Sequence, residues 1–339
     1  MVQGKCNTFL PDDWTFNRLV YAVESLTNAG FYVLLDNQFR HDNTVLERTS
    51  NWVQSWVKLI TAISADGVAQ ARTMVDILNE PDWMNLRWEA SDGKPGAGDL
   101  YLQAMDALYS VNPGLLFFIE DRQVSDSLAK CLDAKLVSMA FPYSAVGSSI
   151  AAVDYLVAWS PFSVSGLSDP TTFFRELFGK PYLDRTIMAP RINPPSVTGT
   201  TANSTGEALW TSLDTGFGYL SQQGFCYDDF CRVFPIAMAE SGSNFTTAAD
   251  LHMMFDLSSY MSNSGSASTG NHAIIGSWFW ATWPPNRPIV GGIQTDDADE
   301  IQWGKINYLA ELGLTPCRPV STVLPRGLNL RQTLAPQQT

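Results

Sequence analysis

The sequence has few basic residues, few histidines and no long apolar run. Only 21 of its 339 residues are Lys or Arg, against 34 Asp or Glu, and the formal net charge is −13. Nucleic acids and anionic membrane surfaces are bound through a basic field, so we expect neither as a partner. An uninterrupted stretch of about 18 apolar residues, the minimum for a membrane-spanning helix, is also missing from the sequence.

Cysteine is scarce as well, and its spacing is unlike that of metal sites. The five cysteines are Cys6, Cys131, Cys226, Cys231 and Cys317. There is no Cys-x-x-Cys pair and no histidine nearby at ligand spacing, so we expect no metal. Glycine-rich stretches such as 241–243 lack the lysine of a P-loop and the dinucleotide fingerprint, so we expect no cofactor either. Cys226 and Cys231 flank a short loop and could form a disulfide in an oxidising compartment.

The remaining composition is that of a folded protein with a sizeable core, since 45% of the residues are hydrophobic. We expect one large domain over residues 1–315, with an insertion of uncertain structure at about 134–178. A flexible tail containing Pro and Gln is expected over 316–339. The N-terminal residues lack the apolar stretch of a secretory signal, so the sequence alone leaves the localisation unknown.

Apolar runs and helical periodicity alternate along the chain. We predict strands at 31–36, 74–80, 115–120, 186–190, 234–239 and 274–281. We predict helices at 14–28, 51–64, 100–111, 205–222, 248–262 and 299–312. This alternation predicts an α/β fold of the (β/α)8 TIM-barrel type. About six of eight strands are evident, and no segment before residue 31 has the pattern of a strand, so we expect an incomplete barrel.

Two of the predicted strands deliver a carboxylate at their C-terminal end. The run 74–78 closes in Asn79-Glu80-Pro81, and the run 234–239 ends at Glu240. In a parallel barrel this end of the strands is the face on which active sites are built. Two carboxylates there can cleave a glycosidic bond, one as acid and one as nucleophile or base. Taken alone, the tripeptide is better explained as a turn or a helix cap.

Several ordered segments together resemble glycoside hydrolase family 5, the cellulase family. The segments 34–37, 77–81, 111–120, 235–240 and 278–283 with 291–293 are similar, in that order, to the family's third, fourth, fifth, seventh and eighth barrel strands. The resemblance extends over about 14–314. It implies a retaining glycosidase that acts on a β-linked polysaccharide such as β-1,4-glucan, with poly- or oligosaccharide as its partner. It also implies a secreted protein, and we expect a monomer.

The resemblance assigns a role to each matching residue. Glu240 would be the nucleophile and Glu80 the acid/base, both on one face of the barrel. Asn79 would hydrogen-bond the sugar 2-hydroxyl, and Trp283 would form the platform beneath the sugar ring. The remaining substrate-binding positions are Asn37, Arg191 and Asn193. Two simpler interpretations stay open: Asn79 as a turn residue and Trp283 as a core residue.

Three positions depart from the family pattern. Gln38 stands where the family usually has His, and Arg191 and Asn193 stand where its sixth strand has His and Tyr. A permanently charged Arg191 in the cleft would lower the pKa of nearby carboxyls and impair Glu80 as an acid. A second hypothesis is therefore a sugar-binding protein that has lost turnover. A third is a truncated chain whose open sheet edges invite aggregation.

Overall fold

A computed structural model describes residues 13–37, 44–79, 81, 86, 88–91, 93–120, 170–192, 194, 205–222, 224–227, 229–243, 245, 247–262, 274–279, 293 and 301–312. The predicted C-terminal tail and most of the predicted insertion lie outside these residues. No helix within the described ranges is both long and apolar enough to cross a membrane.

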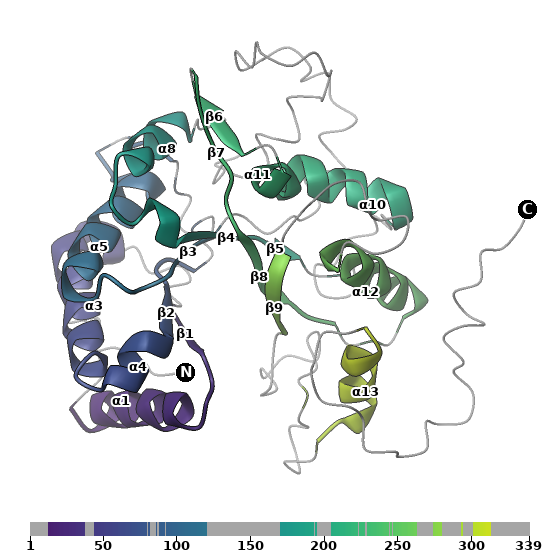
Figure 1. Cartoon of the computed structure of the whole chain (residues 1–339), viewed down its shortest axis with the longest axis horizontal. Helices are drawn as coiled ribbons and strands as arrows, with labels where there is room; N and C mark the ends of the chain where they lie inside the picture. The colour runs from purple at the N-terminus through teal and green to yellow at the C-terminus, as the bar shows by residue number, and fades with distance from the viewer. Residues whose placement is uncertain are drawn as a thin grey trace, which may run out of the picture.

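A parallel sheet forms the centre of the molecule (Figure 1). Its strands are β1 (Val33–Asp36), β2 (Thr73–Asp76), β3 (Phe117–Glu120), β4 (Thr186–Ala189), β8 (Ile236–Ser241) and β9 (Ile274–Phe279). They pair in that order, and a short β5 (Arg191–Ile192) continues β4 beyond Pro190 and also pairs with β8. Parallel strands in sequential order are the arrangement of a β/α barrel. The predicted fold class is confirmed: within the described residues the sheet is a curled part of a barrel.

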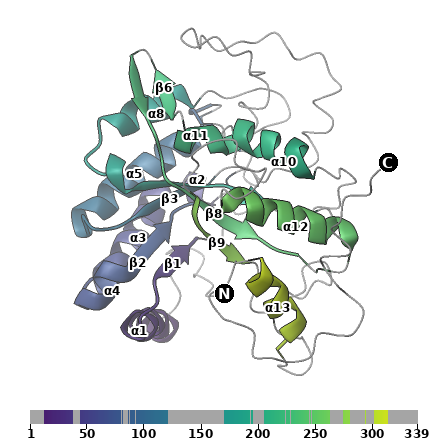
Figure 2. The same cartoon turned by 45° about the vertical axis from the view of Figure 1, so that its right-hand side comes forward.

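All six predicted strands and all six predicted helices are present, with shifted bounds. The helices are α1 (Asp13–Asn28), α2 (Thr44–Glu47), α3 (Thr49–Ile63), α4 (Gly67–Arg72), α5 (Ala97–Val111), α8 (Thr171–Phe178), α10 (Gly206–Leu213), α11 (Tyr219–Gln222), α12 (Ala248–Met261) and α13 (Trp303–Glu311). A π-helical segment, Asp214–Gly218, interrupts the predicted helix 205–222. Figures 1 and 2 show α1, α3, α4 and α5 beside one end of the sheet and α10, α12 and α13 beside the other.

The two faces of the sheet have different partners. Val75, Phe117, Met188, Ile236 and Met238 belong to the large core that the helices share, and we call this the outer face. The opposite, inner face carries a small cluster made only by strand residues and Leu116, which precedes β3. Its members are Leu34, Met74, Leu116, Phe118, Ile187, Ala189, Ala237 and Ala239. The alternation follows from the two-residue period of a strand, and the inner cluster corresponds to the filled interior of a barrel.

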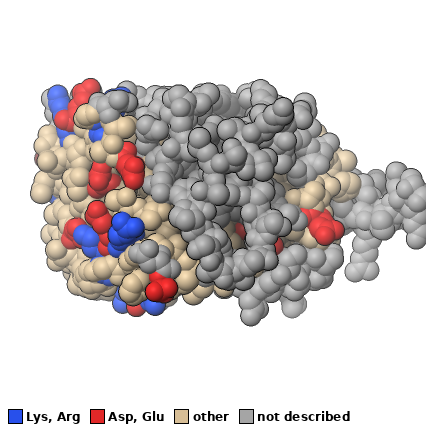
Figure 3. Space-filling view, turned by 90° about the horizontal axis from the view of Figure 1, so that it is seen from above, with Lys and Arg blue, Asp and Glu red and all other residues tan. Residues whose placement is uncertain are grey.

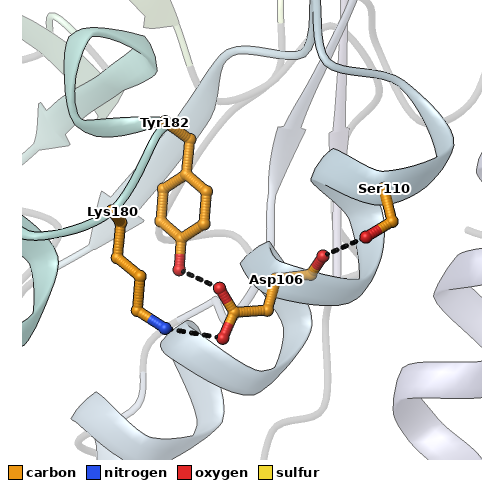
Figure 4. A network of polar contacts seen from close by, with 4 residues as sticks. All are labelled: Asp106, Ser110, Lys180 and Tyr182. Atoms are coloured by element: carbon orange, nitrogen blue, oxygen red, sulfur yellow. Dashed lines mark hydrogen bonds and ion pairs between the residues drawn. The ribbon is translucent and has the colours of Figure 1, made fainter.

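Polar contacts fix α5 to the segment that leads into β4 (Figure 4). Asp106 on α5 accepts a hydrogen bond from the Tyr182 hydroxyl at 2.9 Å and pairs with Lys180 Nζ at 2.7 Å. Burial of Tyr182, followed by its hydrogen bond to Asp106, raises the pKa of the phenol. Elsewhere on the surface, acidic and basic side chains lie among one another on the described part of the face in Figure 3.

A small antiparallel hairpin precedes β8. It is formed by β6 (Phe225–Tyr227) and β7 (Phe230–Arg232), in which Cys226 and Cys231 are register partners and form a disulfide. The pairing that the spacing of these two cysteines allows is therefore present in the structure. Arg232 forms an ion pair with Asp184, which joins the hairpin to the turn before β4.

Candidate active site

The C-terminal ends of β1 and β2 are joined by backbone hydrogen bonds that extend beyond the last strand residues. Asn37 N–H donates to Asp76 O at 3.2 Å, and Asn79 N–H donates to Asn37 O at 3.3 Å. Trp52 on α3, which is 1% exposed, donates its indole N–H to Asn37 Oδ1 at 2.9 Å. Two predicted site residues, Asn37 and Asn79, are thus direct neighbours. The Trp52 indole holds the amide of Asn37 in one orientation.

The ends of β2 and β3 meet at the hydroxyl group of Tyr101 on α5. This oxygen lies 3.1 Å from Leu78 O and 3.3 Å from Glu120 O, and it accepts the Glu120 N–H at 3.1 Å. Tyr101 and Glu120 are both fully buried. Glu120 is a further carboxylate at the C-terminal edge of the sheet, and its position follows from the end of the apolar run 115–119. No sequence pattern indicates that the Tyr101 hydroxyl contacts these two strand ends.

Glu240 lies one residue before the end of β8 and is 7% exposed. Because Ile236 and Met238 lie on the outer face, strict alternation would place Glu240 there as well. The pairing register contradicts strict alternation. Met188 pairs with Ile236, and Arg191 pairs with Glu240. The chain therefore advances three residues along β4–β5 but four residues along β8 between these two pairs.

This extra residue in β8 changes the face on which Glu240 stands. Ile192 belongs to the outer core, and its register partner is Ser241. Glu240, one position earlier, therefore falls on the inner face of the sheet. Pairing of β8 with β9 is also irregular between Met238 and Ser241. Extra residues of this kind re-aim side chains next to active sites in many sheets.

The loop that follows Glu240 is fixed on the N-terminus of α12. Ser243 donates its hydroxyl to Asp250 Oδ2 at 3.2 Å and accepts the Phe245 N–H at 2.9 Å. Phe245 has a φ of 54°, a left-handed conformation that costs a non-glycine residue about 1 kcal/mol or more. Thr247 caps the helix by accepting the Asp250 N–H at 3.1 Å. These contacts hold the strained backbone in place.

The structure describes only some of the predicted site residues. Asn37, Asn79 and Glu240 lie at the C-terminal edge of the sheet, and the backbone of Arg191 is the register partner of Glu240. The others, Gln38, Glu80, Asn193 and Trp283, lie outside the described residues. In the sheet order β2 and β8 are separated by β3 and β4. Within the described ranges, no three His, Cys, Asp or Glu side chains are grouped so as to hold a metal ion.

Comparisons with known proteins find similarity in structure alone. No model of a known protein family matches the sequence. No curated protein matches it either. The catalytic domain of the major endoglucanase from Xanthomonas campestris pv. campestris matches with a TM-score of 0.58 and 16% identity, over 90% of this chain and 76% of that one.

A second group of matches comes from an archaeon. A hyperthermophilic endocellulase from Pyrococcus horikoshii matches with a TM-score of 0.56 and 15% identity, over 88% of this chain and 74% of that one. A single-substitution variant of the same endocellulase, in complex with cellotetraose, gives a TM-score of 0.56 and 15% identity, over 91% of this chain and 79% of that one. At such identities the similarity establishes the fold, which this chain shares with these endoglucanases.

Proposed function

We propose that this chain is a glycosidase of the cellulase type, which hydrolyses the O-glycosyl bonds of a β-linked polysaccharide. The observation that carries the proposal is the position of Glu240, a buried carboxylate at the C-terminal end of β8 and on the inner face of a barrel sheet. The second carboxylate is that of Glu80, which follows Asn79 beyond β2. The fold shared with two endoglucanases supports the same class of reaction.

In the proposed mechanism the two carboxyl groups act in sequence. Glu240 attacks the anomeric carbon while Glu80 gives its proton to the leaving oxygen, and a covalent glycosyl-enzyme forms. Glu80 then takes a proton from water, whose oxygen attacks the anomeric carbon and releases Glu240. The configuration is retained, which requires carboxyl groups about 5 Å apart. Glu80 must hold its proton near the working pH, so its surroundings should raise its pKa.

The other predicted residues would bind the sugar around this pair. Asn79 would donate to the 2-hydroxyl, and Trp283 would stack beneath the ring, with Asn37 and Asn193 as further polar contacts. Arg191 would have two opposed effects in this scheme if its side chain entered the cleft. A cation there would favour the ionised nucleophile, but it would also lower the pKa of Glu80, which the acid role requires to be raised. The substrate would be a β-glucan.

A carbohydrate-binding protein without turnover is the second candidate. The features that favour it are Gln38, Arg191 and Asn193, which replace the side chains usual in the resembling family. Such a protein would keep an affinity for cello-oligosaccharides and hydrolyse none of them. The same two carboxylates would then have no catalytic role.

Hydrolysis of a soluble β-glucan by the wild type and by Glu240→Gln tests the proposal. We expect the wild type to release reducing ends, with the β-anomer formed first in an NMR time course because retention is predicted. The variant should lose at least about 100-fold in rate. Glu207→Gln, an exposed substitution on α10 with the same change of charge, is the matched control and should keep the wild-type rate.

Two other results would point elsewhere. Equal rates for the wild type and Glu240→Gln would sink the enzyme hypothesis, because the activity would not come from this site. No hydrolysis together with saturable calorimetric heat on titration with cellotetraose would favour the binding protein. No hydrolysis and no heat would exclude both.

A further inference from the structure

One peptide group is held at both of its polar atoms directly before the proposed acid/base. Leu78 O and Asn79 N–H belong to the same peptide bond. The carbonyl oxygen lies 3.1 Å from the Tyr101 hydroxyl, and the N–H donates to Asn37 O at 3.3 Å. Since a peptide unit is planar, fixing both ends fixes its plane. Glu80 follows directly after Asn79 in the sequence.

Beyond the last paired residues of β2 and β3, the Tyr101 hydroxyl replaces the direct backbone hydrogen bonds between the two strands. The described pairing between β2 and β3 covers Val75 with Phe117 and Asp76 with Phe118. Beyond it β2 leaves the ladder, and the Tyr101 hydroxyl lies between Leu78 O and the Glu120 N–H. A hydroxyl suits this position because it donates and accepts at one atom. It lets the chain turn away from β3 while both backbone groups stay hydrogen-bonded.

The hydroxyl is itself held in position by a rigid setting. Tyr101 is fully buried on α5, with its ring 6.3 Å from that of Trp88 and 6.2 Å from that of Phe173. The helix begins with a capping interaction in which Asp99 accepts the Gly96 N–H at 2.9 Å. Close packing of the Tyr101 ring against these neighbours restricts the side chain to one rotamer, and this fixes the position of its hydroxyl.

We propose that Tyr101 is a positioning residue for the proposed acid/base: its hydroxyl fixes the Leu78–Asn79 peptide and the end of β3, and the chain continues from that peptide directly to Glu80. This inference rests on the function proposed above. It assigns Tyr101 no contact with substrate. Its effect should fall on proton donation, because a displacement of about 1 Å in a catalytic group can cost about 100-fold in rate.

Tyr101→Phe tests the inference, since it removes the hydroxyl and keeps the ring. The matched control is Tyr182→Phe, which removes a hydroxyl from an equally buried tyrosine that bonds Asp106 on the outside of α5. Both variants should lose stability, because each removes a hydroxyl that is hydrogen-bonded in the folded protein. With soluble β-glucan we expect kcat/KM to fall about 100-fold in Tyr101→Phe and to stay within about threefold of wild type in Tyr182→Phe.

A second substrate separates positioning from a general structural defect. Dinitrophenyl β-cellobioside has a leaving group that departs without protonation, so its glycosylation step does not need the acid. Tyr101→Phe should keep kcat/KM within a few-fold of wild type on this substrate. An equal loss on both substrates, or no loss on β-glucan, would overturn the inference.

Failure of the proposed function would look different. A wild type that hydrolyses neither substrate overturns that function, and amide hydrogen exchange then decides the structural part of the inference. Faster exchange of the Glu120 N–H in Tyr101→Phe than in Tyr182→Phe would support the role of the hydroxyl in holding these strand ends. Unchanged exchange would overturn it.

Discussion

At the scale of single residues, Gly218 occupies a position with no room for a methyl group. It ends the π-helical segment, where a Cβ would overlap the Tyr260 hydroxyl and lie 2.8 Å from Asp214 Oδ1. Tyr260 on α12 donates to the same Asp214 oxygen at 2.7 Å, and Gln222 donates to it at 2.9 Å. The absence of a side chain at 218 is what lets α12 approach this closely.

Gly218→Ala should therefore destabilise the protein by about 1–3 kcal/mol, as overpacking of a filled site does. Gly304→Ala on α13 is the matched control. No atom lies within 4 Å of its added Cβ, so there the same change should stabilise the helix by about 0.5–1 kcal/mol. Urea unfolding measures both. Combining Tyr260→Phe with Gly218→Ala should recover part of the loss, and strictly additive effects would contradict the proposed overlap.

The sequence predicts the strand-end residues of the candidate site but not what holds them. Asn79 and Glu240 each follow an apolar run, and a run that stops at a polar residue can be read without a structure. Tyr101 and Trp52 cannot be found in this way, because their role depends on where a helix side chain meets a strand end. The extra residue in β8 is equally hidden, since it is a property of pairing with β4, β5 and β9.

At the scale of elements, length decided what could be predicted. Helices such as α3 and α5 have four turns of periodic apolar residues, and the strands are continuous apolar runs. The helices and strands missed are short: α2 has four residues, α4 six and α8 eight, β5 has two, and β6 and β7 have three each. The predicted strand 74–80 stops at Asp76, because beyond it the backbone turns to Asn37 and Tyr101.

The junction between α5 and β4 should make stability depend on alkaline pH. The pKa of Tyr182 is raised above its ordinary value of 10.0, chiefly by burial and then by Asp106. A raised folded-state pKa means that the unfolded chain loses this proton first. The contribution of the Tyr182 hydroxyl is therefore fully present below about pH 10 and is lost as the pH rises beyond it.

We expect wild type to be more stable than Tyr182→Phe by about 1–2 kcal/mol at pH 8, because the hydroxyl donates to a carboxylate. The difference should shrink steadily from pH 9.5 to pH 11. Urea unfolding at a series of pH values measures it. Because lysines and other tyrosines titrate in both proteins, the comparison isolates Tyr182. A difference that stays constant across this range would contradict the assignment.

At the scale of the whole molecule, one edge of β1 is unpaired among the described residues, and exposed apolar side chains occur in β1's neighbours along the chain. Among the described residues β1 pairs with β2 alone. Phe31 and Tyr32, which precede β1, are 61% and 67% exposed, and Trp14 and Tyr21 on α1 are similarly exposed. Unpaired strand edges of this kind are templates for association with another chain.

This edge predicts weak self-association at high concentration, although we expect a monomer when the protein is dilute. Tyr32→Lys should reduce it, because a lysine beside an edge strand opposes pairing. The control is Phe230→Lys on β7, where the aromatic ring is 64% exposed and the change of charge is the same, but the site lies in the hairpin. Sedimentation velocity over a concentration series should show association in wild type and Phe230→Lys and less in Tyr32→Lys. An equal reduction in both variants would mean that net charge governs association. A wild type that stays monomeric at every concentration would show that this edge does not mediate self-association.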